Sequence, residues 1–375
     1  MNLAFALGPA AGGSPESVRL TVEALRARGH EVAEVPCPRP WHGSERGFVG
    51  PRWWLRSARH LLPAARRAQV IHAQDRRWIA GAWLAGRLTG RPVVVTVRDT
   101  GLLCPLVTCL VWEGPLIPAN CGALRLWDHC APWYLTTYRQ RGRGRIMVRW
   151  WALGVERALA RRARLAVPSH GLADFLAPHL GRRPDVLPSP VVVPFGHDDC
   201  DRDWLDLDPS VLFVGKPSLG KGFLDFALAA ADLAGRAKFV HAGQQPRLPC
   251  PTVLSVGPLT REELEVAYCA AAVVVVPSRC ADALPRVALE AQAHGRPVVG
   301  TTMGGIPDIV EDGATGLVVP PARHEHLTKA IASLLDAGPD ARRVLGQAGR
   351  ARMETRFSPA GVAEAHERLY GEVMR

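Results

Sequence analysis

Short apolar runs rich in β-branched residues alternate with amphipathic stretches along most of the chain. In the first half, apolar runs at residues 70–73 and 92–97 flank an amphipathic stretch at residues 79–88. Runs of this length and composition are typical of buried parallel strands, and the stretch between them has the period of a helix. The repeated strand–helix–strand order predicts an α/β fold built on parallel sheets.

The first 37 residues follow the same order and add a glycine pair. A strand at residues 3–7, a helix at residues 18–28 and a strand at residues 31–35 surround Gly12 and Gly13. Glycines between a strand and a helix let the backbone come close to a phosphate or a sugar. A tight turn that binds nothing explains the pair equally well.

The most regular pattern spans residues 271–321. An apolar strand at residues 271–276 is followed by a loop, by a helix at residues 285–293 that closes at Gly295, and by a second buried strand at residues 297–300. In α/β folds, ligands bind at the carboxyl ends of the parallel strands, which is where this loop lies. We therefore expect a ligand site there.

Two acidic residues mark this expected site. Asp282 lies in the loop and Glu290 lies in the following helix, with seven residues between them. Eight positions are a little over two helical turns, so the two carboxylates can face the same crevice. Each can accept the paired hydroxyls of a sugar or a ribose. On spacing alone, the alternative is that Glu290 caps a neighbouring backbone group and Asp282 is a solvated loop residue.

Two lysines follow the strand that opens the second half of the chain. The strand at residues 211–214 ends in Gly215 and Lys216, and Lys221 stands just before the next helix. Two ammonium groups and the N–H groups of a helix N-terminus suit a diphosphate. The alternative is that both lysines are solvated surface charges, although the chain has only four lysines.

The length of 375 residues is enough for two domains with separate cores. A polar, turn-rich stretch at residues 195–209 predicts the linker between them. We therefore expect a first domain at residues 1–197 and a second domain at residues 198–356.

Positive charge is concentrated in the first half. Residues 1–197 contain 27 arginines, no lysine and 12 acidic residues, a net charge of +15, and the remaining residues carry −4, which together give the chain's +11. This imbalance favours an anionic partner, such as nucleic acid, lipid headgroups or lipid phosphates. A GC-rich genome is the alternative explanation for the arginines. We expect no nucleic acid partner, because no recognition helix or stacking-aromatic motif is present.

Two segments combine tryptophan with arginine, at residues 52–68 and 133–164. Such segments can lie on an anionic membrane surface. The alternative for the first is a peripheral helix that packs Trp53, Leu55 and Leu61 against the sheet. No apolar run approaches the roughly 18 to 20 residues of a membrane span, and the N-terminus lacks the features of a signal peptide. We expect a cytoplasmic protein that can bind the inner face of the membrane peripherally.

The nine cysteines do not form a regular pattern. Four of them, Cys104, Cys109, Cys121 and Cys130, are clustered. Their spacings lack the CxxC pairs of a zinc site. We therefore predict no metal site and interpret them as ordinary thiols rather than as metal ligands or a disulfide.

The stretch PSRCADALPRVALEAQAHGRPVVGTTMGGIPDIVEDGATGLVV, residues 277–319, resembles the donor-site signature of glycosyltransferase family 4. Members of this family are retaining enzymes with the GT-B fold. That fold has two Rossmann-like domains with parallel sheets that face a central cleft. The resemblance implies that the first domain binds the acceptor and the second binds the nucleotide-sugar. It also implies that a last helix, at about residues 357–375, crosses back to the first domain.

The resemblance assigns roles to the residues of the second half. Glu290 would hold the nucleotide ribose. Asp282 would meet hydroxyls of the donor sugar, although it stands where the family has glutamate. Lys216 and Lys221 match the family's basic pair and would bind the phosphates.

The backbone near Gly215 and from Leu284 to Val287 would approach the diphosphate, and the backbone around Leu259 would line the base pocket. Pro285 stands where many members have glycine, which removes one N–H donor.

In the first half the resemblance is more diffuse. Gly12 and Gly13 fit the glycine loop after the first strand. Arg98 and Asp99 stand where many members have His-Asp, and that histidine lies close to the donor sugar. Arg98 could instead bind an anionic acceptor or pair with Asp99.

The activity implied is the transfer of a hexosyl unit, with retention, from a UDP-sugar or GDP-sugar to an acceptor. The acceptor could be a glycan, a lipid-linked molecule or a small molecule. No cofactor or metal would be required, and Lys216, Lys221, Asp282 and Glu290 would act as the catalytic residues. The alternative is a non-catalytic GT-B module, because Arg98 and Asp282 are changes that would accompany the loss of transfer.

Overall fold

The computed structural model describes residues 1–8, 14–38, 50–103, 143–194, 209–246 and 250–375. These residues form two compact units. Among these described residues, the first unit takes those that lie within 1–103, 143–189 and 362–375, and the second takes those that lie within 190–361. Gly12, Gly13, the four clustered cysteines and most of the expected linker lie outside the described residues.

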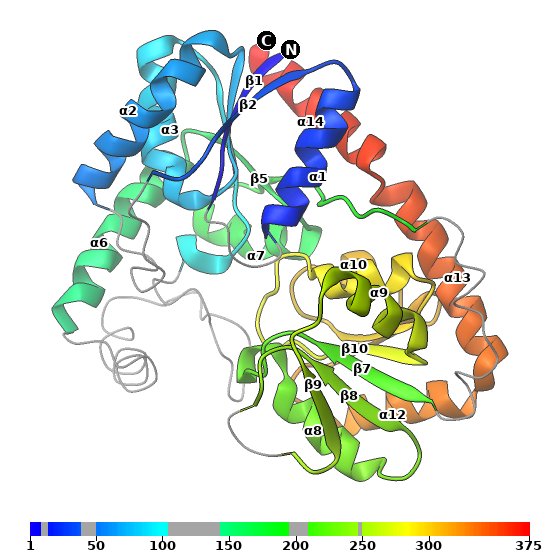
Figure 1. Ribbon diagram of the computed structural model, residues 1–375. Coiled ribbons are helices and arrows are strands. Elements are labelled where there is room, and N and C mark those ends of the chain that lie inside the picture. Colours follow the sequence, from blue (N-terminus) through cyan, green and yellow to red (C-terminus); the bar gives the residue numbers. More distant parts are fainter. Residues whose placement is uncertain (9–13, 39–49, 104–142, 195–208, 247–249) are drawn as a thin grey trace. The chain divides into compact units, whose positions relative to one another are not determined.

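The first unit is built on a parallel sheet with the strand order β2-β1-β3-β4-β5-β6. The strands are β1 (Asn2–Ala6), β2 (Glu31–Val35), β3 (Val70–Ala73), β4 (Val93–Thr96), β5 (Arg164–Val167) and β6 (Asp185–Val186). The helices are α1 (Ser14–Ala27), α2 (Pro51–Arg67), α3 (Ile79–Thr89), α6 (Arg143–Ala160), α7 (His170–Leu180) and α14 (Pro359–Met374). Helices α2 and α3 lie on one side of the sheet, and α1 and α14 lie on the other (Figure 1).

The C-terminal helix α14 is part of the core of the first unit. Its residues Leu369 and Tyr370 pack with Leu3 and Phe5 of β1 and with Leu25 of α1. All five side chains are buried. The apolar face of this last helix is therefore buried against the sheet that contains the N-terminal strand β1.

The second unit repeats the architecture with the strand order β12-β11-β10-β7-β8-β9. The strands are β7 (Ser210–Val214), β8 (Lys238–Ala242), β9 (Val253–Gly257), β10 (Val273–Val276), β11 (Val298–Thr301) and β12 (Gly316–Val319). The helices are α8 (Phe223–Asp232), α9 (Arg261–Ala270), α10 (Arg286–Ala293), α11 (Ile306–Ile309), α12 (His324–Asp336) and α13 (Gly338–Arg356). All strand pairs are parallel.

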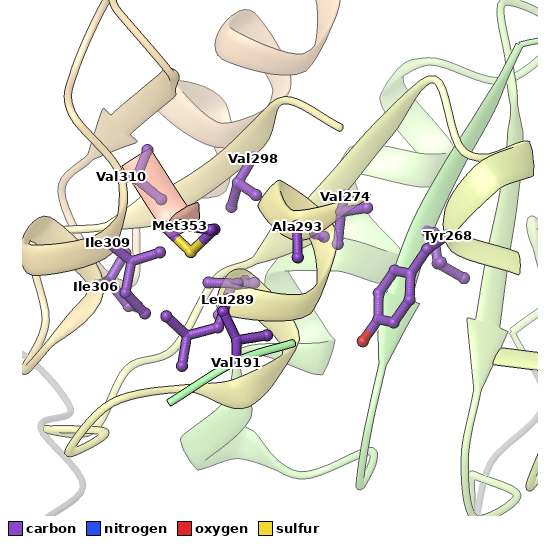
Figure 2. Packing of buried hydrophobic residues seen from close by; sticks show 14 of the residues in the cluster. Val191, Tyr268, Val274, Leu289, Ala293, Val298, Ile306, Ile309, Val310 and Met353 are labelled. Carbon is purple, nitrogen blue, oxygen red and sulfur yellow. The ribbon is translucent and has the colours of Figure 1, made fainter. Parts of the chain in front are cut away.

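Alternation along the strands sends side chains to both faces of this second sheet, and both faces are buried. On one face, Val274 and Val298 pack with Leu289 of α10 and Met353 of α13, as Figure 2 shows. On the other face, a separate cluster joins the strands to α8 and α12. The continuous valines of β10 thus form the two-sided buried strand that their sequence predicts.

Strand β6 ends at Val186, because Pro188 and Pro190 lack the N–H groups that would continue the ladder. One expectation for the first unit needs correction. In α2, Leu61 is buried as expected, but Leu55 is 63% exposed and does not pack against the sheet.

The strand order of the second unit sets the position of its ligand site. From β7 the chain runs to β8 and β9 on one side and then returns to place β10 on the other side of β7. The carboxyl ends of β7 and β10 are therefore neighbours at a topological switch point, which is where open parallel sheets bind ligands.

Candidate functional site

Lys221 and Asp282 meet at this switch point. The Lys221 ammonium donates to a carboxylate oxygen of Asp282, although the two residues are 61 positions apart. The Lys221 side chain is 44% exposed and that of Asp282 is 17% exposed. Burial lowers the pKa of Lys221, but the Asp282 carboxylate outweighs this and the pKa is raised. Lys221 is therefore a fixed, accessible cation at the carboxyl edge of the sheet.

The loops that carry this ion pair are locked together by backbone contacts. The carbonyl of Gly220 accepts hydrogen bonds from the N–H groups of Arg279 (2.9 Å) and Cys280 (3.2 Å). Gly222 has a φ of +74°, and a Cβ there would clash with the carbonyl oxygen of Pro277. The loop after β7 can approach the loop after β10 this closely only because residue 222 is glycine.

A second glycine pair holds Asp282 from the other side. Gly304 has a φ of +57°, and a Cβ there would clash with the carbonyl oxygen of Asp282. The N–H of Gly305 donates to the same oxygen at 2.8 Å. Asp282 is thus positioned by main-chain contacts on both sides, which leaves its side chain to face Lys221.

A third contact also holds the loop after β10 in place. The Arg279 guanidinium forms a bidentate ion pair with the carboxylate of Asp225 in α8. Asp225 is 2% exposed, so this is a buried link between α8 and the loop after β10. Sequence reasoning did not identify Arg279 or Asp225, because they are 54 positions apart and no local pattern joins them.

Three glycines with positive φ lie at the carboxyl ends of three adjacent strands of the second unit. Gly215, Gly243 and Gly257 have φ values of +134°, +153° and +86°. The N–H of Gly243 donates to the carbonyl of Gly257 at 2.8 Å, and a Cβ on Gly243 would clash with the carbonyl of Gly215. This edge of the sheet is consequently free of side chains at three neighbouring positions, which lets a flat or highly charged ligand approach the backbone.

The buried His241 fixes the first of these glycines. Its Nε2–H donates to the carbonyl of Gly215 at 2.9 Å, and its Nδ1 accepts from the hydroxyl of Ser255 at 3.1 Å. Lys216 follows Gly215 directly and is exposed. Lys216 forms no ion pair with any residue in the described part of the chain.

Glu290 lies in a different set of contacts from Asp282. One carboxylate oxygen accepts hydrogen bonds from Arg286 (2.9 and 3.1 Å) and from Arg261 (3.0 Å). The other oxygen accepts from the hydroxyl of the buried Tyr268 at 3.0 Å. The side chains of Glu290 and Arg286 are only 7% and 11% exposed. Within the described ranges, no hydrogen bond or ion pair joins Glu290 to Asp282 or Lys221.

The structure thus brings Lys221 and Asp282 together and adds three partners of Glu290 that sequence reasoning missed. Arg286 could have been found, since it precedes Glu290 by one helical turn and such pairs attract. Arg261 and Tyr268 lie on α9 and reach Glu290 only through the tertiary fold. Burial raises the pKa of the Tyr268 hydroxyl well above its usual value, and the Glu290 carboxylate adds to the shift, so Tyr268 remains a hydrogen-bond donor at neutral pH.

The other predicted contacts of the second unit lie at the edges of its core. Leu284 is buried, and Val287 and Leu259 pack partly buried against the same core cluster. Helix α10 begins directly after Pro285, which has extended backbone angles and provides no side-chain cap. The side chains of Leu284 and Val287 therefore face the core, so a ligand contact at these two residues would be made by the backbone.

In the first unit, Arg98 follows β4 and is held by neutral partners. Its guanidinium donates to the amide oxygen of Gln74 at 2.9 Å and to the hydroxyl of Ser189 at 3.0 Å. Asp99 has a different role. It accepts from the N–H of Gly101 at 2.8 Å and forms an ion pair with Arg76 at 3.3 Å. Arg98 therefore links the segments that follow β3, β4 and β6. Asp99 fixes the turn that follows β4.

No group of three histidine, cysteine or acidic side chains in the described ranges could hold a metal ion. None of the helices there has both the length and the apolar character needed to cross a bilayer.

Comparison with known proteins gives partial matches in sequence. Residues 208–337 match the family model described as "Glycosyl transferases group 1". The alpha-D-kanosaminyltransferase of Streptomyces kanamyceticus is 30% identical over 187 residues, which cover 46% of this chain and 48% of that protein. The D-inositol 3-phosphate glycosyltransferase of Mycobacteroides abscessus is 45% identical over 125 residues, which cover 33% of this chain and 25% of that protein. The chain thus spans about half or less of the length of these curated relatives.

Comparison of structures covers nearly the whole chain. Sucrose-phosphate synthase from Thermosynechococcus elongatus superimposes with a TM-score of 0.67 and 23% identity, over 99% of this chain and 98% of that one. Anabaena HepE, solved in complex with UDP-glucose, superimposes with a TM-score of 0.68 and 16% identity, over 98% of this chain and 99% of that one. The two Rossmann-like units with parallel sheets therefore have the GT-B fold of glycosyltransferases, as the sequence predicted.

Proposed function

We propose that this protein is a retaining glycosyltransferase of family 4 that transfers a hexosyl unit from a UDP-sugar or GDP-sugar. The observation that carries the proposal is the Lys221–Asp282 ion pair at the switch point of the second sheet. This pair lies within the segment that matches the glycosyltransferase family model. The proposal of a nucleotide-sugar donor is supported by the GT-B neighbour solved with UDP-glucose.

In the proposed mechanism, the chain stabilises charge on the leaving group and does not supply a nucleophile. Lys221 would donate to the departing diphosphate, and Lys216, which is exposed beside Gly215, would add a second cation. Such preorganised donors act where negative charge develops in the transition state. The leaving phosphate would help to deprotonate the acceptor, and Asp282 would orient Lys221 and meet hydroxyls of the donor sugar. Transfer would need no metal.

Glu290 is proposed to bind the ribose. This binding would require one of the present hydrogen-bond donors to leave the Glu290 carboxylate. A ribose hydroxyl would replace one of the arginine donors on the carboxylate, and Arg261 is the one that can move, because its side chain is 44% exposed. Arg286 is nearly buried and would stay. Donor binding would therefore shift Arg261 from Glu290 towards Glu265, with which it already pairs at 2.9 Å.

The experiment that tests the proposal is a donor screen. The purified protein is incubated with UDP- and GDP-sugars and an acceptor panel, and the release of nucleoside diphosphate is measured. The anomeric configuration of the product, read by NMR, tests retention, and repetition with a chelator tests metal independence. Release from no donor under any of these conditions would contradict the enzyme proposal.

A second candidate is a non-catalytic GT-B module, and one observation favours it. Both oxygens of Glu290 are already occupied by donors of the chain itself. Calorimetry separates the candidates. Binding of a nucleotide-sugar without turnover on any acceptor would support the module.

A peripheral membrane contact and a cytoplasmic location stay predictions. Helix α2 supports the contact with the exposed Leu55 and with arginines that include Arg52, Arg59 and Arg66, and it contains no acidic residue. Flotation with phosphatidylglycerol vesicles tests the membrane contact. The natural chain is compared with a variant in which these three arginines are replaced by glutamine.

A further inference from the structure

The first unit contains a cavity of about 1010 Å³ at the amino ends of its central strands. Arg98 lies at the opposite, carboxyl ends of these strands. Gln69, Pro92 and Ala163 line it, and they lie just before β3, β4 and β5. Arg98 and its partner Gln74 lie after the strands, at their carboxyl ends. Four residues of β3 separate Gln69 from Gln74, so the two edges are about 15 Å apart. The cavity is therefore not part of the candidate site.

The side chains that line this cavity are strongly basic. Arg87, Arg91, Arg162 and Arg375 contribute guanidinium groups, and no acidic residue is among the lining residues. Within the described ranges, none of these four arginines forms an ion pair. The concentration of positive charge in a concave surface attracts anions, because the potentials of the four groups add.

Neighbouring arginines of the same unit have carboxylate partners. Arg164, which follows the cavity residue Ala163, pairs with Asp185 and with Glu372 at 2.7 Å. Arg28 pairs with Glu364 and Glu367 of α14. The carboxylates of this region are thus used on arginines outside the cavity, and the arginines inside it are left for an external anion.

Part of the cavity wall is apolar. Trp83 and Val93 line it, and the Arg87 guanidinium lies 5.8 Å from the centre of the Trp83 ring. Contact with an aromatic face orients a guanidinium and reduces the entropy it loses on binding. The close packing of this wall depends on Gly86, since a Cβ there would clash with the side chain of Val93.

We propose that this cavity binds a diphosphate-bearing ligand, with the arginines on the phosphates and the wall of Trp83 and Val93 on the group attached to them. The volume exceeds what one phosphate needs, and it is at the upper end of the range for small-molecule sites. Arginine binds phosphate oxygens in bidentate fashion, so three or four such groups suit two phosphates. The ligand can be a soluble diphosphate or the headgroup of a lipid.

The test compares two triple variants of the full chain. The cavity variant is Arg87→Gln, Arg91→Gln and Arg162→Gln. The matched control is Arg323→Gln, Arg356→Gln and Arg368→Gln, which removes the same charge from exposed arginines that line no part of the cavity. Both sets are at the surface, so equal thermal unfolding midpoints are expected and verify that each variant is folded.

Two probes distinguish the sources of the ligand. Calorimetry with inorganic pyrophosphate at low salt measures a soluble diphosphate, and co-sedimentation with phosphatidylcholine vesicles containing diacylglycerol pyrophosphate measures a lipid diphosphate. We expect saturable binding of at least one probe, weakened about tenfold or more in the cavity variant and unchanged in the control. Equal affinities in the two variants, or no saturable binding of either probe, would overturn the proposal. The inference is independent of sugar transfer, because nucleoside diphosphate release from the donor is expected to be the same in both variants.

Discussion

His72 of β3 hydrogen-bonds with Tyr370 of α14, with 2.6 Å between Nδ1 and the phenol oxygen. The other ring nitrogen of His72 lies 2.7 Å from the hydroxyl of Thr96. A second buried imidazole, that of His366, lies 5.7 Å from the first between ring centres. The last helix is therefore fastened to the first sheet through a buried polar network that contains two histidines.

This network predicts that acid weakens the folded first unit. Burial lowers the pKa of His366 to about 4, and burial together with His366 and Arg98 lowers the pKa of His72 well below its usual value. In the unfolded chain both would titrate near 6.5. Between about pH 6.5 and pH 4 the unfolded state thus binds more protons, so stability falls as the pH falls, by at most about 1.4 kcal/mol per histidine and pH unit.

The unfolding midpoint measured from pH 7.5 to pH 4.5 checks this. The variant His366→Gln should show a shallower fall than the natural chain, and His326→Gln, at an exposed position, should follow the natural chain. Identical slopes in all three proteins would show that the buried histidines do not contribute.

Replacement of Lys221 by alanine is expected to reduce turnover of the donor at least about 100-fold. The physical reason is the loss of a positioned cation at the charge that develops on the leaving group. Stability should change by less than about 1 kcal/mol, since the ion pair with Asp282 is partly exposed. Steady-state release of nucleoside diphosphate measures the effect. Lys329→Ala, which removes an exposed lysine of α12, is the control, and an equal loss in the two variants would contradict the role of Lys221.

Replacement of Glu290 by alanine is expected to destabilise the second unit by about 3 kcal/mol. The change leaves the nearly buried Arg286 without its carboxylate, and an uncompensated buried charge is costly. Urea unfolding measures the loss. The double variant Glu290→Ala with Arg286→Met should recover part of it.

Glu265→Ala is the control for this experiment. It removes an exposed partner of the same Arg261 and should cost less than about 1 kcal/mol. If the Glu290 and Glu265 variants unfold alike, the buried ion-pair set contributes little to stability.

Two glycines with the same backbone conformation should respond differently to alanine. Gly222 (φ +74°) would meet the carbonyl of Pro277, whereas Gly181 (φ +72°) has open space around the added Cβ. Alanine at Gly181 should cost about 1 kcal/mol from the left-handed conformation alone. At Gly222 the clash adds to this, and about 3 kcal/mol is expected. Chemical denaturation of the two variants measures the difference, and equal costs would mean that the two loops of the candidate site can move apart.

The period of apolar residues was enough to predict most elements of the fold. Strands β2 and β3 have the predicted bounds, and β10 and β11 begin within two residues of theirs. The sequence was less informative where a tertiary contact decides the outcome. The partners of Glu290 on α9 come from 22 and 29 positions away, and no periodicity encodes them. The site predicted from sequence is therefore supported for Lys221 and Asp282 as neighbours, whereas the roles of all its residues stay proposals.

The first unit recruits its last segment, residues 362–375, from beyond the second unit. During synthesis the second unit has all of its chain available as soon as residue 361 has emerged. The first unit, although translated earliest, must wait for Tyr370 before the pocket around His72 can close. The unit that is translated first is thus completed later than the second unit, and a chain that lacks residues 362–375 would leave one face of its N-terminal sheet uncovered.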